Sequence, residues 1–135
     1  MKKYKLTDNK INGLFQIQAL IDIPEYEIKK GDLGGFIESE SNLSHNGNAW
    51  VSDNALVYGN ATVCGNAIIK QTKDYMTIGP IGDNRHITIT KSNKMVHAGC
   101  FNKSFEEFKE AVDKKYKGEG DYYHCFGLIK KYLEV

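Results

Sequence analysis

The residues best suited to binding chemistry lie in a glycine-rich loop and in the segment that follows it. Residues 79–85 read Gly-Pro-Ile-Gly-Asp-Asn-Arg, so backbone N–H groups beside two small residues accompany a guanidinium group. This combination could hold a phosphate or a partner's carboxylate. The loop lacks the ending of a P-loop and the spacing of a dinucleotide fingerprint, so a plain hairpin loop is the alternative. The predicted binding residues are Gly79, Gly82, Arg85, Lys91 and Lys94.

Two histidines and two cysteines in the C-terminal part are candidate metal ligands. His97 and Cys100 are separated by two residues, and His124 is followed directly by Cys125. Zinc prefers four nitrogen or sulfur ligands in a tetrahedron, whereas adjacent residues of a helix point about 100° apart. The pattern therefore favours Cys100 and Cys125 as small buried side chains, and we expect neither a metal nor a cofactor.

The middle of the chain is repetitive. Three consecutive hexads in residues 51–68 share valine at the first position, asparagine at the fourth and alanine at the fifth. Residues 43–50 are a related unit with two extra residues. This pattern is typical of a hexapeptide β-helix, in which the valines, here Val51, Val57 and Val63, point inward and Gly-Asn pairs form the corners. Because the repeat is little more than one coil, it needs neighbours to cover its ends.

Hexapeptide β-helices are best known from acyltransferases, which use a histidine to remove a proton from the acceptor. His45 is the single histidine of the repeat, and no second base or extended loop accompanies it. We therefore expect His45 to be a polar corner residue and expect no catalytic residue. An atypical hexapeptide-repeat acyltransferase is kept as an alternative.

The segments on either side of the repeat are predicted to cover it. Residues 28–37 contain three glycines suited to tight bends and are expected to form another part-coil. Alternating residues 13–18 and 19–23 predict a β-hairpin or a meander. Downstream, residues 75–79, 87–90 and 94–98 predict a three-stranded sheet.

Two helices are predicted after this sheet. Ser104 begins a Ser-x-x-Glu capping box, and apolar residues at helical spacing follow it. Asp121 can cap a second helix. Gly127 inside that helix costs about 1 kcal/mol relative to alanine, which predicts a close packing contact at this position.

The predicted fold class is mixed α/β of the α+β type. It is a short hexapeptide-type β-helix capped by a small β-sheet with a C-terminal helical hairpin. Residues 1–70 are expected to form the β-hairpin and the short β-helix, and residues 71–135 the α+β cap module.

Composition and charge exclude several classes of protein. The 135 residues carry 18 basic and 17 acidic side chains, so the net charge of +1 does not favour direct binding to nucleic acid. Three cysteines without a Cys-x-x-Cys pair exclude a disulfide framework. No apolar run approaches the roughly 20 residues that span a bilayer, and no signal peptide is recognisable. We expect a cytoplasmic protein without membrane contact.

The charges are unevenly distributed along the chain. Residues 31–68 contain four acids and no lysine or arginine, whereas residues 69–103 are basic. A predicted acidic face would include Asp32, Glu38, Glu40 and Asp53. The exposed strand edges of so short a repeat also predict a homodimer or a higher oligomer, with Trp50 and Tyr58 as contact candidates.

Three features of the N-terminal half stand out together: residues 31–37 (Gly-Asp-Leu-Gly-Gly-Phe-Ile), residues 42–55 and the repeated Gly-Asn-Ala. In these features the chain resembles a family of small phage and prophage proteins with hexapeptide-type repeats. Residues 77–82 and 98–101, before the capped helix, resemble a module attached to such proteins. The resemblance covers residues 28–135. It implies an accessory phage protein with a counter-defence role, such as inhibition of a CRISPR nuclease.

The leading hypothesis is therefore a non-catalytic, phage-derived interaction protein in the cytoplasm of an infected bacterium. It would inhibit or sequester a host defence protein or nucleoprotein, in the manner of an anti-CRISPR inhibitor of a type II nuclease. The alternatives are a binder of a small phosphorylated ligand or signalling nucleotide, and the atypical acyltransferase.

Overall fold

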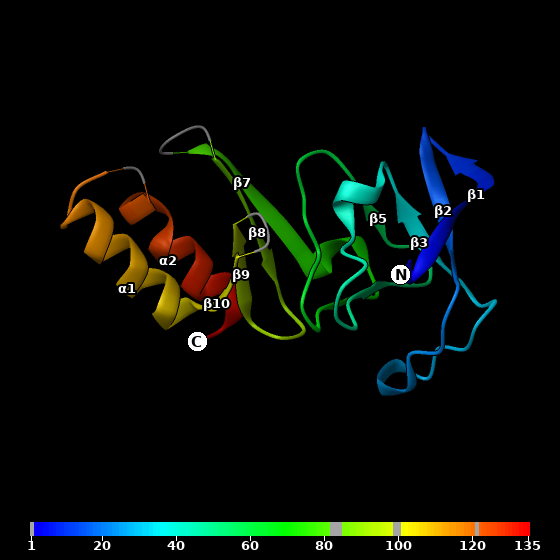
Figure 1. The fold of residues 1–135 in the computed structure, drawn as a ribbon. Coiled ribbons are helices and arrows are strands. Elements are labelled where there is room, and N and C mark those ends of the chain that lie inside the picture. The colour runs from blue at the N-terminus through cyan, green and yellow to red at the C-terminus, as the bar shows by residue number, and fades with distance from the viewer. Residues whose placement is uncertain (1, 82–84, 99–100, 121) are drawn as a thin grey trace.

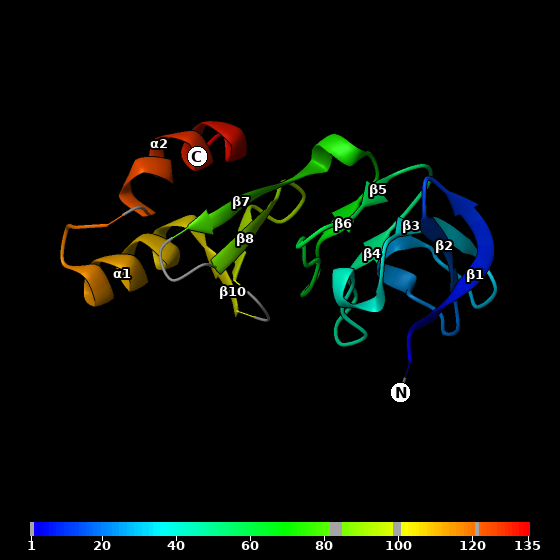
Figure 2. The same cartoon turned by 90° about the horizontal axis from the view of Figure 1, so that it is seen from above.

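The computed structural model describes residues 2–81, 85–98, 101–120 and 122–135. The chain forms three layers in sequence order, with the N-terminal β-structure at one end, a four-stranded sheet in the middle and two helices at the other end (Figure 1). A view turned by 90° shows the same order (Figure 2). The predicted α+β class is confirmed. Among the described residues, no helix is both long enough and apolar enough to cross a membrane.

The N-terminal hairpin joins β1 (Tyr4–Ile11) to β2 (Leu14–Ala19). Its turn is Asn12-Gly13, and both residues have positive φ values, 52° and 82°, as a two-residue hairpin turn of type I′ requires. Residues 13–18 thus contribute a strand of an antiparallel meander, as one of the two predicted alternatives has it, but β2 pairs with the earlier segment and not with residues 19–23. The hairpin extends to β3 (Leu33–Ile37), which is antiparallel to β2.

The repeat segment, defined here as residues 33–70, contains three parallel pairings. Ile37 of β3 pairs with Val57 of β5 (Leu56–Val57), and an isolated bridge joins Leu43 to Val63. The third pair joins β4 (Trp50–Val51) to β6 (Ile68–Ile69). Three hexads separate the partners of this third pair, and slightly longer stretches separate those of the other two.

The inner positions of the repeat segment form a continuous apolar core. Val51, Val57 and Val63 are fully buried, which confirms their predicted inward orientation. The alanines of the hexads are buried beside them, and the hairpin contributes Tyr4 and Ile17 to the same cluster. Short 3₁₀ turns lie before the segment at Pro24–Tyr26, within it at Glu40–Asn42 and after it at Thr72–Asp74.

The middle sheet has the order β10-β9-β8-β7 and is antiparallel throughout. Its strands are β7 (Tyr75–Ile81), β8 (Arg85–Thr90), β9 (Met95–Ala98) and β10 (Phe101–Ser104). The sequence predicted only three strands, because β10 lies directly against the helix cap at Ser104 and its four residues have no apolar alternation.

Two helices cover one face of this sheet: α1 (Phe105–Tyr116) and α2 (Tyr122–Leu133). The predicted capping box is confirmed, since Ser104 Oγ accepts the Glu107 N–H at 3.2 Å and Glu107 Oε1 accepts the Ser104 N–H at 3.0 Å. The predicted packing contact at Gly127 is wrong, because no neighbouring atom would lie within 4 Å of an added Cβ there. Asp121 lies outside the described residues.

Both faces of β8 are covered. Ile87 and Ile89 belong to the apolar core beneath the helices. Thr88 and Thr90, on the opposite face, are also buried and lie toward the repeat segment. The sheet is thus the middle layer, with an apolar face toward the helices and a polar face toward the repeat.

Candidate functional site

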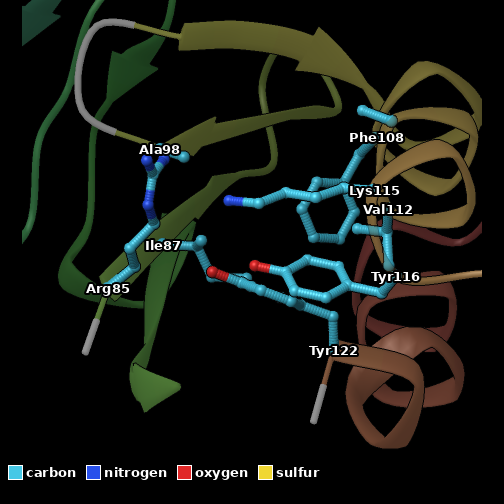
Figure 3. Close-up of a pocket in the computed structure, with 9 residues that line it drawn as sticks. Arg85, Ile87, Ala98, Phe108, Val112, Lys115, Tyr116 and Tyr122 are labelled. Atoms are coloured by element: carbon cyan, nitrogen blue, oxygen red, sulfur yellow. The ribbon is translucent and has the colours of Figure 1, made fainter. Parts of the chain in front are cut away.

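A pocket with a volume of about 170 Å³ lies between the apolar face of the sheet and helix α1. Its floor and walls are mostly apolar, and two cationic side chains, Arg85 at the start of β8 and Lys115 near the end of α1, belong to its lining. The residues drawn in Figure 3 line it, with Ala111 as the ninth: Arg85, Ile87, Ala98, Phe108, Ala111, Val112, Lys115, Tyr116 and Tyr122.

Three polar side chains from the helical side extend into this pocket, whereas the guanidinium group of Arg85 is directed toward Ala98 (Figure 3). The Lys115 amine and the hydroxyls of Tyr116 and Tyr122 extend from the helical side toward Ile87 and Arg85 on β8 (Figure 3). The Lys115 Nζ also lies 5.2 Å from the centre of the Tyr116 ring, a cation–π distance that favours its position at the pocket wall. The site therefore combines two cationic side chains with a mostly apolar lining.

The aromatic wall of the pocket is held by ring contacts. Phe108 meets Tyr122 edge to face, with centroids 6.0 Å apart, and Tyr116 lies 5.5 Å from Tyr122. Phe108 also meets Phe126 edge to face at 5.8 Å. Pairs in these geometries contribute about 0.5–1.5 kcal/mol each beyond the area they bury, so the wall is formed before any ligand arrives.

The structure places only one of the predicted cations in this site. Lys91 and Lys94 lie in the turn that follows β8, whereas Arg85 begins the strand. Six residues of strand separate the two ends by about 20 Å. The predicted cluster of Arg85 with Lys91 and Lys94 is therefore wrong, and Lys91 instead places its Nζ 4.9 Å from the ring centre of Tyr132.

The predicted glycine loop is in part strand. Gly79 lies inside β7, and a Cβ there would approach the carbonyl oxygen of Arg85 to 2.7 Å. Gly79 is thus needed for the close approach of β7 and β8, and not as a ligand-binding turn. Gly82 lies outside the described residues.

The four carboxylates of the predicted acidic face are exposed, but most of them already accept hydrogen bonds within the chain. Glu40 accepts from His45 at 2.8 Å and pairs with Lys2 at 3.2 Å, and these partners hold its pKa below the usual value. Glu38 accepts the N–H of Gly59 and Asp32 accepts the N–H of Lys29. Asp53 has a positive φ of 54° at a corner. These side chains shape the turns of the N-terminal part.

The two oligomer-contact candidates differ in exposure. Trp50 is 1% exposed and meets Tyr4 edge to face at 6.4 Å, so its assignment to a contact surface is wrong. It lies in the interior because the repeat face that carries it packs under the N-terminal hairpin. Tyr58 is 53% exposed and stays a contact prediction.

His45 is a corner residue with both ring nitrogens engaged. Its ring stacks on Tyr4 with centroids 4.1 Å apart. Nδ1 accepts the backbone N–H of Lys3 at 3.1 Å, so the ring proton is on Nε2, which donates to Glu40. An acyltransferase base needs a free nitrogen lone pair directed at its acceptor, and neither nitrogen of His45 offers one.

A buried chain of hydrogen bonds, which the sequence did not indicate, joins the sheet to the repeat segment. His97 Nε2 lies 2.7 Å from Thr90 Oγ1, and that hydroxyl donates to Asn93 Oδ1 at 2.6 Å. Thr90 therefore accepts from His97 Nε2–H, and His97 Nδ1 accepts the thiol proton of Cys64 at 3.1 Å. Asn93 continues the chain by donating to Asn66.

Burial lowers the pKa of His97 to about 4, which keeps the imidazole neutral at physiological pH. Two more hydrogen bonds cross the same junction. Thr88 Oγ1 accepts the N–H of Thr62, and Ser92 Oγ accepts the N–H of Ile68, both at 2.9 Å. Hydroxyls of β8 and of the turn that follows it thus satisfy backbone donors among residues 62–68, at the end of the repeat segment.

The candidate metal ligands are dispersed among the described residues, and no three His, Cys, Asp or Glu side chains there come together as a metal site would require. Cys125 is buried, its thiol donates to the Tyr122 carbonyl at 2.9 Å, and burial raises its pKa. His124 is exposed on α2, and Cys100 lies outside the described residues.

No protein-family model matches the chain, and no curated protein matches it closely enough to serve as a relative. The resemblance to phage proteins therefore stays a hypothesis.

Proposed function

We propose that the protein is a non-catalytic interaction protein that binds an anionic group of its partner in the pocket of Arg85 and Lys115. The presence of two cationic side chains, Arg85 and Lys115, in the lining of one mostly apolar pocket carries this proposal. Such a site binds an anion through charge-assisted hydrogen bonds and excludes water from its apolar side.

The environments of the histidines support a binding role over a catalytic one. His45 and His97 each have both ring nitrogens in hydrogen bonds with neighbouring groups. Cys64 is also buried, so its thiol does not face a substrate site. The acyltransferase alternative consequently lacks an available base in the repeat segment.

We further propose that the repeat segment is a short β-helix of two turns, with the sheet as its cap. Three parallel pairings favour this interpretation, because each joins positions about three hexads apart. The hydroxyls of Thr88 and Ser92 supply the acceptors that an open end of a β-helix needs.

In the setting that the resemblance implies, the partner is a defence protein or nucleoprotein of a phage-infected bacterium. The protein would block or sequester it by stoichiometric binding. A homodimer in which Tyr58 lies at the contact is part of the same proposal, and light scattering at tens of micromolar distinguishes it from a monomer.

The test is capture of the partner from infected host cells by three tagged proteins: wild type, Arg85→Glu and Lys94→Glu. We expect Arg85→Glu to lose the partner, because it replaces attraction by repulsion inside the pocket. Lys94→Glu makes the same charge change at the other end of β8 and should retain it. Equal capture by all three would contradict a role for the pocket.

The second candidate is a binder of a small phosphorylated ligand, which the same cationic pocket supports. A ligand that binds the folded state raises the melting temperature as its concentration rises. Melting curves with a series of mononucleotides and dinucleotides test this candidate. A volume of about 170 Å³ favours a ligand that places one ring in the pocket over one that buries a whole nucleotide.

A further inference from the structure

We infer that the outer face of the N-terminal sheet, of order β1-β2-β3-β5, binds the same face of a second copy of the chain in a two-fold symmetric dimer. This inference rests on the homodimer of the proposed function. It specifies the surface, its symmetry and the charged pair that aligns the two copies.

The strand register divides this sheet into an inner and an outer face. Successive residues of a strand alternate between the faces, and directly opposite residues of paired strands share one. Tyr4, Ile17 and Ile37 point inward, because they belong to the core beneath the sheet. The alternate positions point outward, and six of them are apolar: Ile11, Leu14, Leu33, Phe36, Leu56 and Tyr58.

This outer face is open and has its own apolar surface. Leu14 and Phe36 are buried, yet they belong to neither of the two apolar cores. Ile11, Leu33 and Tyr58 are 45%, 54% and 53% exposed, and they are three of the five large apolar side chains that are exposed among the described residues. The sheet lies at the end of the molecule away from the helices (Figure 1). Apolar residues that gather on an open face indicate an interaction surface.

Two opposite charges lie at the two ends of the outer face. Lys5 shares a row with Gln18 and Leu33 at one end. Glu38 follows β3 at the other end, where it lines a groove with Tyr58. Both charged side chains are exposed, and the ion pairs within the described part of the chain involve neither of them. The face therefore carries both members of an ion pair, held too far apart to form it within one copy.

This arrangement of charge fits a second copy of the same chain. A two-fold axis in the plane of the sheet exchanges the two ends of the face, so Lys5 of each copy lies opposite Glu38 of the other. One symmetric contact then forms two ion pairs. The apolar residues between them meet those of the partner, as in two sheets that pack face to face.

The experiment is analytical ultracentrifugation of the full chain over a concentration series. We expect wild type to dimerise, and Lys5→Glu and Glu38→Lys each to weaken the dimer about tenfold or more, because each variant sets like charges opposite one another twice. An equimolar mixture of the two variants should restore the dimer, since both contacts then pair a glutamate with a lysine. Circular dichroism verifies the fold of each variant.

Two outcomes of this experiment would overturn the inference. One is a wild type that stays monomeric throughout the series. The other is a mixture that associates no more tightly than its two components, because a two-fold contact between Lys5 and Glu38 requires the mixed dimer to form.

A matched pair of variants tests the apolar part of the surface. Leu33→Glu should weaken the dimer about tenfold or more, because it buries an unpaired charge in the contact. Leu128→Glu is the control, since Leu128 is 56% exposed on α2 and lies outside the sheet. It should dimerise like wild type. Dimerisation of Leu33→Glu with wild-type affinity would place the contact elsewhere and overturn the inference.

The outcome is separable from that of the proposed function. Arg85 begins β8, outside the N-terminal sheet, so Arg85→Glu should dimerise like wild type. Loss of partner capture in Arg85→Glu, with a wild type that stays monomeric, would leave the pocket function and remove the dimer surface. A dimer restored by the mixture, with equal capture by wild type and Arg85→Glu, would do the reverse. A monomeric wild type that loses its partner in Leu33→Glu, but not in Leu128→Glu, would assign the face to that partner and overturn the inference.

Discussion

The Nδ1 atom of His97 lies 3.1 Å from the Sγ atom of Cys64, although the two residues are 33 positions apart and belong to different layers. The contact is buried, and it joins the central sheet to the last turn of the repeat segment. A charged imidazole could not accept the thiol proton at this position. The junction therefore requires the neutral form of His97.

Acidification should destabilise the protein through His97. The pKa is about 4 in the folded state and 6.5 for the ordinary side chain, so the unfolded chain binds more protons between these values. The free energy of unfolding should fall by about 3 kcal/mol from His97 alone as the pH decreases from 6.5 to 4. Urea unfolding of wild type and His97→Gln across this range isolates the contribution from that of the carboxylates. Identical slopes of the free energy of unfolding against pH for wild type and His97→Gln would contradict this prediction.

Thr88→Val should destabilise the protein by about 1–3 kcal/mol, because the partly buried N–H of Thr62 loses its acceptor while the side-chain volume is kept. Thr77→Val is the matched control, since Thr77 lies directly opposite Thr88 on β7 and is exposed. That variant should change stability by no more than about 0.5 kcal/mol. Denaturant midpoints of both variants give the comparison, and equal midpoints would remove the role of the Thr88 hydroxyl.

Gly127→Ala should stabilise the protein by about 1 kcal/mol. The position is exposed in the middle of α2, and the added methyl group meets no atom within 4 Å. Alanine then contributes its higher helix propensity without a steric cost. Thermal unfolding measures the gain, and a lower melting temperature would indicate a contact that α2 makes outside the chain.

Gly34→Ala should have the opposite effect. A Cβ at Gly34 would lie 2.6 Å from the carbonyl oxygen of Val51 and 2.7 Å from Ile17 Cγ1. Both neighbours are fully buried, so relief requires β3 to move away from β2 and from Val51 within the repeat segment, at a cost of about 1–3 kcal/mol. Urea unfolding of this variant tests whether β3 is as closely packed as these distances require, and an unchanged midpoint would contradict this.

Local chemistry made several features predictable from the sequence. The inward valines follow from a six-residue period, and the start of α1 follows from the reciprocal bonds of Ser104 and Glu107. The hairpin turn at Asn12-Gly13 also had a recognisable signal, the Asn-Gly pair itself, but the alternation of residues 13–23 favoured a different pairing.

Contacts between distant segments were not predictable in this way. Arg85 and Lys115 lie on different elements, and only the packing of α1 on the sheet places them in one pocket. Lys3 is buried and donates to the Ala49 carbonyl at 2.5 Å, and burial lowers its pKa to about 8. A basic N-terminus would ordinarily indicate a solvated segment. The spacing of residues along the sequence does not predict such contacts, because each depends on how folded segments pack against one another.

The two covered faces of β8 restrict how the chain can change in length. Ile87 and Ile89 pack in the apolar core beneath the helices, whereas the alternate residues Thr88 and Thr90 form hydrogen bonds on the opposite face. One residue inserted between Ile87 and Thr90 would reverse the facing of the residues on one side of the insertion, placing a threonine hydroxyl under the helices and an isoleucine against unpaired N–H groups. The length of a surface loop can change without this loss of packing. In β8, a single-codon insertion or deletion would disrupt both layers at once.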